Sequence, residues 1–148
     1  MQNINIRNKK AGFNYTFIEK YIAGIKLTGT EIKSIRSSNA NLADAYCIFY
    51  NNELFIRGLS ISEYSFGTHS NHEPSQDRKL LLTKKELKKL ERKSTVKGLT
   101  IVAIRLFIND RGWAKVEIAL AKGKQEFDKR ETIKQKDQKR DMDRIRKY

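Results

Sequence analysis

Two apolar segments joined by a short turn constrain the fold of this chain more than any other feature. The segment LTIVAIRLFIND (residues 99–110) is followed by Arg111-Gly112 and then by WAKVEIALAK (residues 113–122). A period of two is typical of half-buried β-strands, so we expect a hairpin with one face on a core and the other carrying charge. On the second strand the expected core face is Ala114, Val116, Ile118 and Leu120, and the expected outer face is Trp113, Lys115, Glu117 and Ala119.

Further strands are predicted on the N-terminal side of this hairpin. AYCIFY (45–50) and LFIRGLSI (54–61) flank Asn51-Asn52, a pair that favours the positive φ of a tight turn. YTFIEKYIAGIKL (15–27) is rich in β-branched and aromatic residues around Ala23-Gly24, which predicts either two strands or one bent strand. Residues 62–79 contain the single proline and are predicted to form a long surface loop.

Two helix starts interrupt the strands. Thr28 and Glu31, and again Thr83 and Glu86, have the spacing of a capping box, in which each side chain bonds the backbone at the other's position. We expect helices of about two to three turns at both places. Short antiparallel strands with one or two helices indicate a mainly β fold, and in particular a small closed barrel of the OB type.

The positive charge is concentrated in three segments. The 148-residue chain has 31 Lys and Arg against 17 Asp and Glu, a formal charge of +14. Residues 76–97 contain nine basic and three acidic side chains, residues 122–148 contain eleven and six, and the N-terminal arm adds Arg7, Lys9 and Lys10. Each segment alone could be a solvated face, but three of one sign favour a polyanionic partner.

RNA is the favoured polyanion. The sequence has no apolar run or wide amphipathic helix suited to a membrane and no signal-peptide stretch, so we expect a cytoplasmic protein. The Lys-rich helix expected after Thr83 carries only Lys, Arg and Glu on its polar face, which does not suit base reading in a DNA major groove. Aromatic side chains could stack on RNA bases, although most are expected in the core. These candidates are Tyr15, Phe17, Tyr21, Phe66 and Trp113.

Little in the sequence indicates catalysis, a cofactor or a metal. Cys47 lies in an apolar run and is expected to be a buried, inert thiol, and His69 and His72 have no thiolate cluster near them. The acids Glu31, Asp44, Glu53 and Asp110 form no metal-binding cluster in sequence. A general OB-type RNA-binding translation factor fits the composition, and an RNA-processing enzyme is a weaker alternative.

Four segments together resemble one family. KLTGTEIKSIR (26–36), NLADAYCIFYNNELF (41–55), HEPSQDRKLLLTKKEL (72–87) and ALAKGKQEFDKRETIK (119–134) are similar, in order and spacing, to the SsrA-binding protein family, SmpB. The resemblance implies a closed six-stranded antiparallel OB-like barrel over residues 1–127. It also implies a basic C-terminal tail, residues 128–148, that is disordered when free and helical on the ribosome.

The function implied by the resemblance is RNA binding, not catalysis. Proteins of this family hold the tRNA-like domain of transfer-messenger RNA (tmRNA). With elongation factor Tu and GTP they deliver it to stalled ribosomes for trans-translation, with the tail in the empty mRNA channel near the decoding centre. We expect a monomer with no cofactor, no metal and no membrane partner.

The resemblance also assigns residues. Asn8, Leu81 and Lys115 occupy positions that support tmRNA binding, although Leu81 could equally be a core residue. Glu31 could be a helix cap or an RNA contact. The expected RNA-binding set is completed by Lys9, Lys10, Lys33, Arg36, Arg78, Lys79, Lys122, Gly123 and Lys124.

The tail is expected to contact the ribosome. Its base, Asp128-Lys129-Arg130, matches a family motif linked to productive accommodation. The expected ribosome contacts are Phe127, Asp128, Lys129, Arg130, Lys134, Lys136, Lys139, Arg140 and Arg144.

The sequence departs from the family pattern at three positions. These are Ile22 in place of a carboxylate, Gln76 in place of an arginine, and Phe127 in place of His or Tyr.

Overall fold

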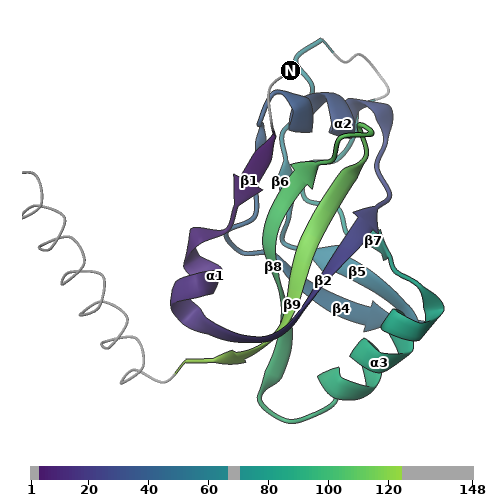
Figure 1. The fold of residues 1–148 in the computed structure, drawn as a ribbon. Helices are drawn as coiled ribbons and strands as arrows, with labels where there is room; N and C mark the ends of the chain where they lie inside the picture. Colours follow the sequence, from purple (N-terminus) through teal and green to yellow (C-terminus); the bar gives the residue numbers. More distant parts are fainter. Residues whose placement is uncertain (1–3, 67–70, 125–148) are drawn as a thin grey trace, which may run out of the picture.

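The computed structural model describes residues 4–66 and 71–124, and the predicted hairpin between residues 99 and 122 is confirmed. Strands β8 (Leu99–Ile108) and β9 (Ala114–Gly123) pair antiparallel, with Leu106 opposite Val116. Gly112 in the connecting turn has φ +83°, a conformation that glycine adopts without steric cost. The hairpin is the longest in the fold, and β9 pairs on its other side with a third strand (Figure 1).

The second predicted hairpin is confirmed in its first part only. Strands β4 (Tyr46–Tyr50) and β5 (Glu53–Arg57) flank Asn51 and Asn52, whose φ values are +49° and +62°. The expected single strand over residues 54–61 is interrupted, because the chain turns at Gly58 with φ +82°. A Cβ added there would lie 2.3 Å from the carbonyl oxygen of Asp44, so the turn has room only for glycine.

The remaining strands complete two sheets. β2 is one strand with a register shift between Phe17 and Glu19, which agrees with the expectation of one bent strand. β7 begins at Arg78, so the predicted loop is shorter by two residues than expected. The bounds are β1 Asn5–Arg7, β2 Tyr15–Ile25, β3 Ala40–Asn41, β6 Ser60–Ile61 and β7 Arg78–Leu81.

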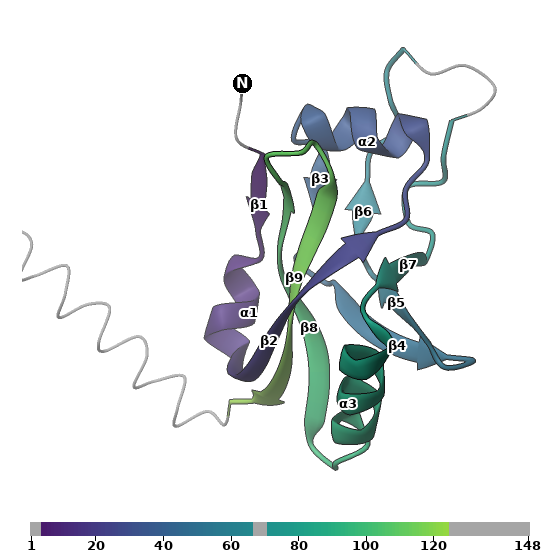
Figure 2. The same cartoon turned by 45° about the vertical axis from the view of Figure 1, so that its right-hand side comes forward.

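The large sheet contains seven strands, all paired antiparallel. Its order is β1-β8-β4-β5-β7-β2-β9, and β9 pairs again with β8. β3 and β6 form a separate two-stranded sheet. Figures 1 and 2 show the strands of the large sheet curving around a common interior, with the helices at its outside. The prediction of a mainly β fold with short helices is therefore confirmed.

Both predicted capping boxes are present. Thr28 and Glu31 cap α2 (Gly29–Arg36), and Thr83 and Glu86 cap α3 (Lys84–Ser94). A third helix, α1 (Lys9–Asn14), was not predicted, because its six residues contain a glycine and no apolar stripe. Its start is set by Asn8, whose side-chain oxygen accepts from the backbone of Ala11 at 3.3 Å.

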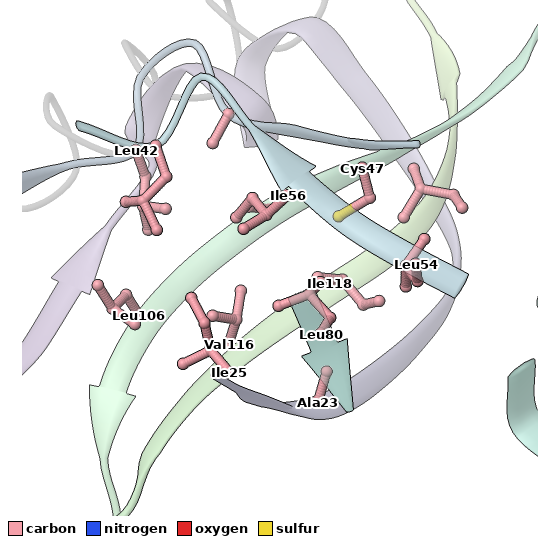
Figure 3. Close-up of a cluster of buried hydrophobic side chains, with 14 of the residues drawn as sticks. Ala23, Ile25, Leu42, Cys47, Leu54, Ile56, Leu80, Leu106, Val116 and Ile118 are labelled. Atoms are coloured by element: carbon pink, nitrogen blue, oxygen red, sulfur yellow. The ribbon is translucent and has the colours of Figure 1, made fainter. Parts of the chain in front are cut away.

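The main core fills the interior between the strands. Figure 3 shows Ile25, Leu54, Ile56, Leu106 and Ile118 converging from different strands. Burying such side chains contributes about 1.5–3 kcal/mol each to stability. Cys47 is buried among them as predicted, and burial raises the pKa of its thiol far above the usual value.

A second, smaller cluster lies on the outer side of the sheet. Ala11 of α1 covers Val102, Ala119 and Ala121 of β8 and β9. The expectation that the whole outer face of β9 carries charge was therefore wrong at Ala119. The face is open at Trp113, Lys115 and Glu117, and closes where α1 packs against it.

The described residues contain no helix both long and apolar enough to span a bilayer. Within the same ranges, no group of three or more His, Cys, Asp or Glu side chains is placed to hold a metal ion.

Candidate nucleic-acid interface

The open part of the outer sheet face is built from two rows of residues that the strand register places side by side. In the first row, Arg7 of β1 lies opposite Arg105 of β8, which lies opposite Glu117 of β9, which lies opposite Ile22 of β2. The alternate residues Leu106, Val116 and Ala23 are fully buried, so the row itself faces outward.

The second row brings together residues from five strands. Asn5, Phe107, Lys115, Gly24 and Leu81 follow one another across β1, β8, β9, β2 and β7. Two of the three residues assigned to tmRNA binding, Leu81 and Lys115, thus lie on either side of Gly24. The interpretation of Leu81 as a core residue was wrong, since its side chain is 51% exposed.

Gly24 keeps the space between these two side chains open. A Cβ added to Gly24 would lie 3.4 Å from Cβ of Leu81 and 3.7 Å from Nζ of Lys115. The glycine therefore forms the floor of a groove of about 480 Å³, which continues to the start of α2. The groove is lined by Gly24, Ile25, Lys26, Leu27, Thr28, Gly29, Ile32, Leu81, Gly112, Trp113, Ala114 and Lys115.

Trp113 forms one wall of this apolar groove. It is 66% exposed at the tip of the β8–β9 hairpin, where an indole gains little from packing. The side-chain oxygen of Asn109 accepts from the backbone of Trp113 at 2.9 Å and of Arg111 at 3.2 Å, which fixes the tip. A large aromatic surface is thus held in place beside two lysines, Lys26 and Lys115.

A second groove, also of about 480 Å³, lies next to the first row and is strongly basic. Among the residues that the structure describes, four cations, Arg7, Lys9, Lys20 and Arg105, line it with one carboxylate, Glu117. Nε of Arg105 lies 3.4 Å from the Glu117 carboxylate, and its guanidinium stacks 4.1 Å from the ring centre of Phe107. The excess of cations makes this groove suited to phosphate groups.

Asn8, the third residue assigned to tmRNA binding, has a structural position at the edge of the basic groove. It is 8% exposed, and its side-chain amide donates to the carbonyl of Ala103 at 3.0 Å. Together with its capping of α1, this contact ties the helix to β8. Asn8 thereby sets the position of Lys9 and Lys10, whose side chains are exposed.

Glu31 and Arg78 lie inside the protein and form an ion pair, with side chains only 1% exposed. Glu31 accepts from the backbone of Thr28 at 2.9 Å and from Gln76 at 3.3 Å, so the cap interpretation is confirmed. Burial opposes the charge on Glu31, but the Thr28 hydrogen bond and the Arg78 guanidinium outweigh it, so its pKa is lowered.

Arg78 uses its remaining donors on the backbone. It donates to the carbonyls of Leu59 at 2.8 Å, Pro74 at 3.0 Å and Glu73 at 3.2 Å. The pair therefore holds the segment before β7 against α2. Glu31 and Arg78 were both expected in the RNA-binding set. The structure buries both side chains, so they support the surface from beneath and are not exposed on it.

The other predicted basic residues occupy two regions. Lys33 and Arg36 are exposed on α2, and Lys79 pairs with Glu53 at 3.1 Å on β7. Lys122, Gly123 and Lys124 lie at the end of β9 beside α1, where Nζ of Lys124 donates to the carbonyl of Gly12 at 3.2 Å. Lys9, Lys10, Lys122 and Lys124 are thus brought to one end of the sheet.

The structure adds three residues that the sequence had not singled out. Lys20, Arg105 and Phe107 lie in the two rows or the basic groove. The alternation of Arg105 and Phe107 around the buried Leu106 was a readable signal of their outward direction, but only the register places them beside Arg7. The ribosome set, Phe127, Asp128, Lys129, Arg130, Lys134, Lys136, Lys139, Arg140 and Arg144, lies outside the described residues.

Comparisons with known proteins agree on one family. A protein from Cytophaga hutchinsonii described as "SsrA-binding protein" is 60% identical over 146 residues, which are 99% of this chain and 95% of that protein. One from Christiangramia forsetii with the same description is 59% identical over 98% of this chain and 92% of that protein.

A solved structure described as "tmRNA-SmpB: a journey to the center of the bacterial ribosome" has a TM-score of 0.70 and 40% identity, covering 83% of this chain and 86% of that one. The family model described as "SmpB protein" matches residues 5–148. The chain therefore belongs to the SmpB family.

Proposed function

We propose that this protein binds the tRNA-like domain of tmRNA and brings it to stalled ribosomes for trans-translation. The observation that carries the proposal is the second row, which places Leu81, Gly24 and Lys115 side by side on an open sheet face. Its family relatives are described as SsrA-binding proteins, and the description of one solved relative names tmRNA and SmpB together with the bacterial ribosome.

The two grooves provide two kinds of contact. The basic groove offers Arg7, Lys9, Lys20 and Arg105 to phosphates, whose negative charge they neutralise. The apolar groove offers Trp113 and Leu81 to a base or ribose. A combination of backbone-binding cations and apolar surface is typical of proteins that recognise folded RNA by shape and by unstacked bases.

Gel-shift titration with the tRNA-like domain tests this proposal. Lys115→Gln and Leu81→Ala should each weaken binding about 5- to 30-fold, since each removes one RNA contact worth about 1–2 kcal/mol. Lys85→Gln on α3 is the matched control, because Lys85 is exposed and lines neither groove. Equal effects of Lys115→Gln and Lys85→Gln would contradict the proposed surface.

We also infer that the six strands β8, β4, β5, β7, β2 and β9 act as one closed OB-like barrel. The support is the ring of pairings, which starts at β8 and returns to it through β9. A closed ring leaves no unpaired sheet edge among these strands. It would keep the two outer rows in fixed register while RNA binds.

The rest of the proposal concerns the ribosome. We assign residues 1–127 to the RNA-binding body and residues 128–148 to a tail that enters the empty mRNA channel and becomes helical there. The tail contains nine basic side chains, and Lys122 and Lys124 precede it; phosphates would neutralise their charge. In this proposal the protein is a cytoplasmic monomer that acts with elongation factor Tu, GTP and aminoacylated tmRNA, and catalyses nothing itself.

The alternative is a general OB-type RNA-binding translation factor. The two are distinguished by competition. The tRNA-like domain of tmRNA should displace labelled RNA at concentrations at least about tenfold lower than bulk tRNA, because specific contacts add to the shared electrostatic attraction. Equal competition by both RNAs would favour the alternative.

A further inference from the structure

An aromatic cluster, Tyr64 and Phe66, lies outside the two grooves. Phe66 is 82% exposed, and its ring meets the ring of Tyr64 edge to face, with centroids 5.7 Å apart. The chain carrying both residues leaves β6 and passes beside α2 (Figure 2). An aromatic side chain so exposed contributes little to stability, and its surface is available to a partner.

The cluster is nevertheless held in place by specific hydrogen bonds. The side-chain amide of Asn71 donates to the carbonyl of Tyr64 at 2.9 Å, and its oxygen accepts from the Tyr64 backbone at 3.2 Å. The next residue, His72, is buried, with Nδ1 2.9 Å from the Thr30 hydroxyl and Nε2 donating to the carbonyl of Ile61 at 2.9 Å. Tyr64 is thus tied through Asn71 and His72 to α2 and β6.

One cation lies against the cluster, and a second lies on the same helix. Nζ of Lys33 lies 5.5 Å from the ring centre of Tyr64, and Arg36 follows one helical turn later on the exposed side of α2. Within residues 4–66 and 71–124, neither cation forms an ion pair with a carboxylate. The acid of α2, Glu31, faces inward to Arg78. Among the described residues, Glu63 beside Tyr64 and Glu73 beside His72 are exposed carboxylates close to the cluster in sequence.

We propose that Phe66, Tyr64 and Lys33 form a second RNA site that stacks one unpaired nucleotide. The base lies on the free face of Phe66, and Lys33 and Arg36 attract its phosphates. Stacking on an aromatic ring beside unpaired cations is the chemistry by which proteins hold single-stranded RNA. The site shares no residue with either groove on the sheet face.

The charge of the cluster selects this occupant over an apolar protein surface. The outer face of β5 and β7 shows the contrast, because there Arg57 pairs with Asp77 at 3.0 Å and Lys79 with Glu53 at 3.1 Å. Among the residues that the structure describes, Lys33 and Arg36 form no such ion pair and are available to an anion. This inference rests on the proposed function only in that both take RNA as the partner.

Fluorescence anisotropy with the full chain tests the site. The probes are a labelled oligoadenylate of about ten nucleotides and a duplex of equal length, each titrated at several salt concentrations. Phe66→Ala should weaken single-strand binding about fivefold or more with no change in the salt slope. Lys33→Gln should lower that slope by about 0.7, the value for one phosphate on a single strand.

Val96→Ala is the matched control, since Val96 is another exposed apolar side chain, 56% exposed, far along the chain after α3. The site is overturned if Phe66→Ala binds the single strand as Val96→Ala does, or loses single strand and duplex equally. A change in oligomeric state without loss of RNA affinity also overturns it, in favour of a protein contact. The Lys115→Gln titration with the tRNA-like domain is independent, so failure of the proposed function is separately visible.

Discussion

Gly24 and Lys115 are register partners across β2 and β9, and only the missing side chain of Gly24 leaves space between Lys115 and Leu81. Glycine in a strand interior weakens a sheet, because it packs nothing and gains conformational freedom when unfolded. Gly24 therefore lowers the stability of the sheet at the centre of the apolar groove. This relationship points to a requirement for close approach of a ligand to the sheet backbone.

The first prediction is that Gly24→Ala separates stability from RNA affinity. The new Cβ meets Leu81 at 3.4 Å, an ordinary van der Waals contact, so the free energy of unfolding should rise by about 0.5–1 kcal/mol. Affinity for the tRNA-like domain should fall several-fold, because the methyl group occupies the groove floor. Urea unfolding and gel shift measure the two effects.

Gly29→Ala is the control for this pair of measurements. Gly29 lines the same groove, but a Cβ there has nothing within 4 Å. Its effect on affinity should be small. If Gly24→Ala and Gly29→Ala bind RNA alike, the floor of the groove is not where RNA approaches.

The second prediction concerns the single carboxylate of the basic groove. Glu117→Gln removes a negative charge beside Arg105 and among four cations, so RNA should bind about two- to fivefold more tightly at low salt. The gain should shrink as salt screens the groove. Anisotropy titrations at two salt concentrations check this, with Glu53→Gln as a carboxylate control outside both grooves. Weaker binding by Glu117→Gln would mean that the carboxylate itself accepts a hydrogen bond from RNA.

The third prediction concerns the buried ion pair. Arg78→Met leaves the Glu31 carboxylate buried without its guanidinium, which should lower the free energy of unfolding by about 3–5 kcal/mol. Arg57→Met removes an exposed pair with Asp77 and should cost less than about 1 kcal/mol. Chemical denaturation at pH 7 compares them. Similar losses for both variants would contradict the role assigned to Arg78.

The same carboxylate makes stability pH-dependent. The pKa of Glu31 is lower in the folded protein than its ordinary value of 4.5, so the folded state binds its proton more weakly than the unfolded chain does. Its contribution is present above pH 4.5 and is lost as the pH falls through the folded pKa. Glu31→Gln should therefore have a flatter stability profile below that pH. An unchanged profile in the variant would assign the acid sensitivity to other groups.

The last prediction separates the two proposed regions of the chain. Truncation after Phe127 should leave affinity for the tRNA-like domain nearly intact, because both grooves lie within residues 7–117. Tagging of nascent peptides on stalled ribosomes should be abolished in a reconstituted translation assay. Equal loss of RNA binding and tagging would contradict a tail that acts only on the ribosome.

Local sequence signals predicted most of the elements but not all of their ends. The capping boxes at Thr28 and Thr83 predicted α2 and α3 because a helix start depends on contacts within one turn. The break of a strand at Gly58 was missed, because its cause is the carbonyl of Asp44, fourteen positions away in the chain. The short helix α1 was missed because its main anchor, the bond from Asn8 to Ala103, spans 95 residues.

In the candidate site, too, local features were predictable from the sequence and long-range contacts were not. The sequence by itself determined the basic charge, the strand alternation and the motifs of the family, since these depend on residue identity and on neighbours along the chain. Only the tertiary structure decided that Leu81 is exposed, that Glu31 and Arg78 are buried together, and that Arg7 lies beside Arg105. Those facts follow from strand register, which joins residues far apart in sequence through hydrogen bonds that no local pattern specifies.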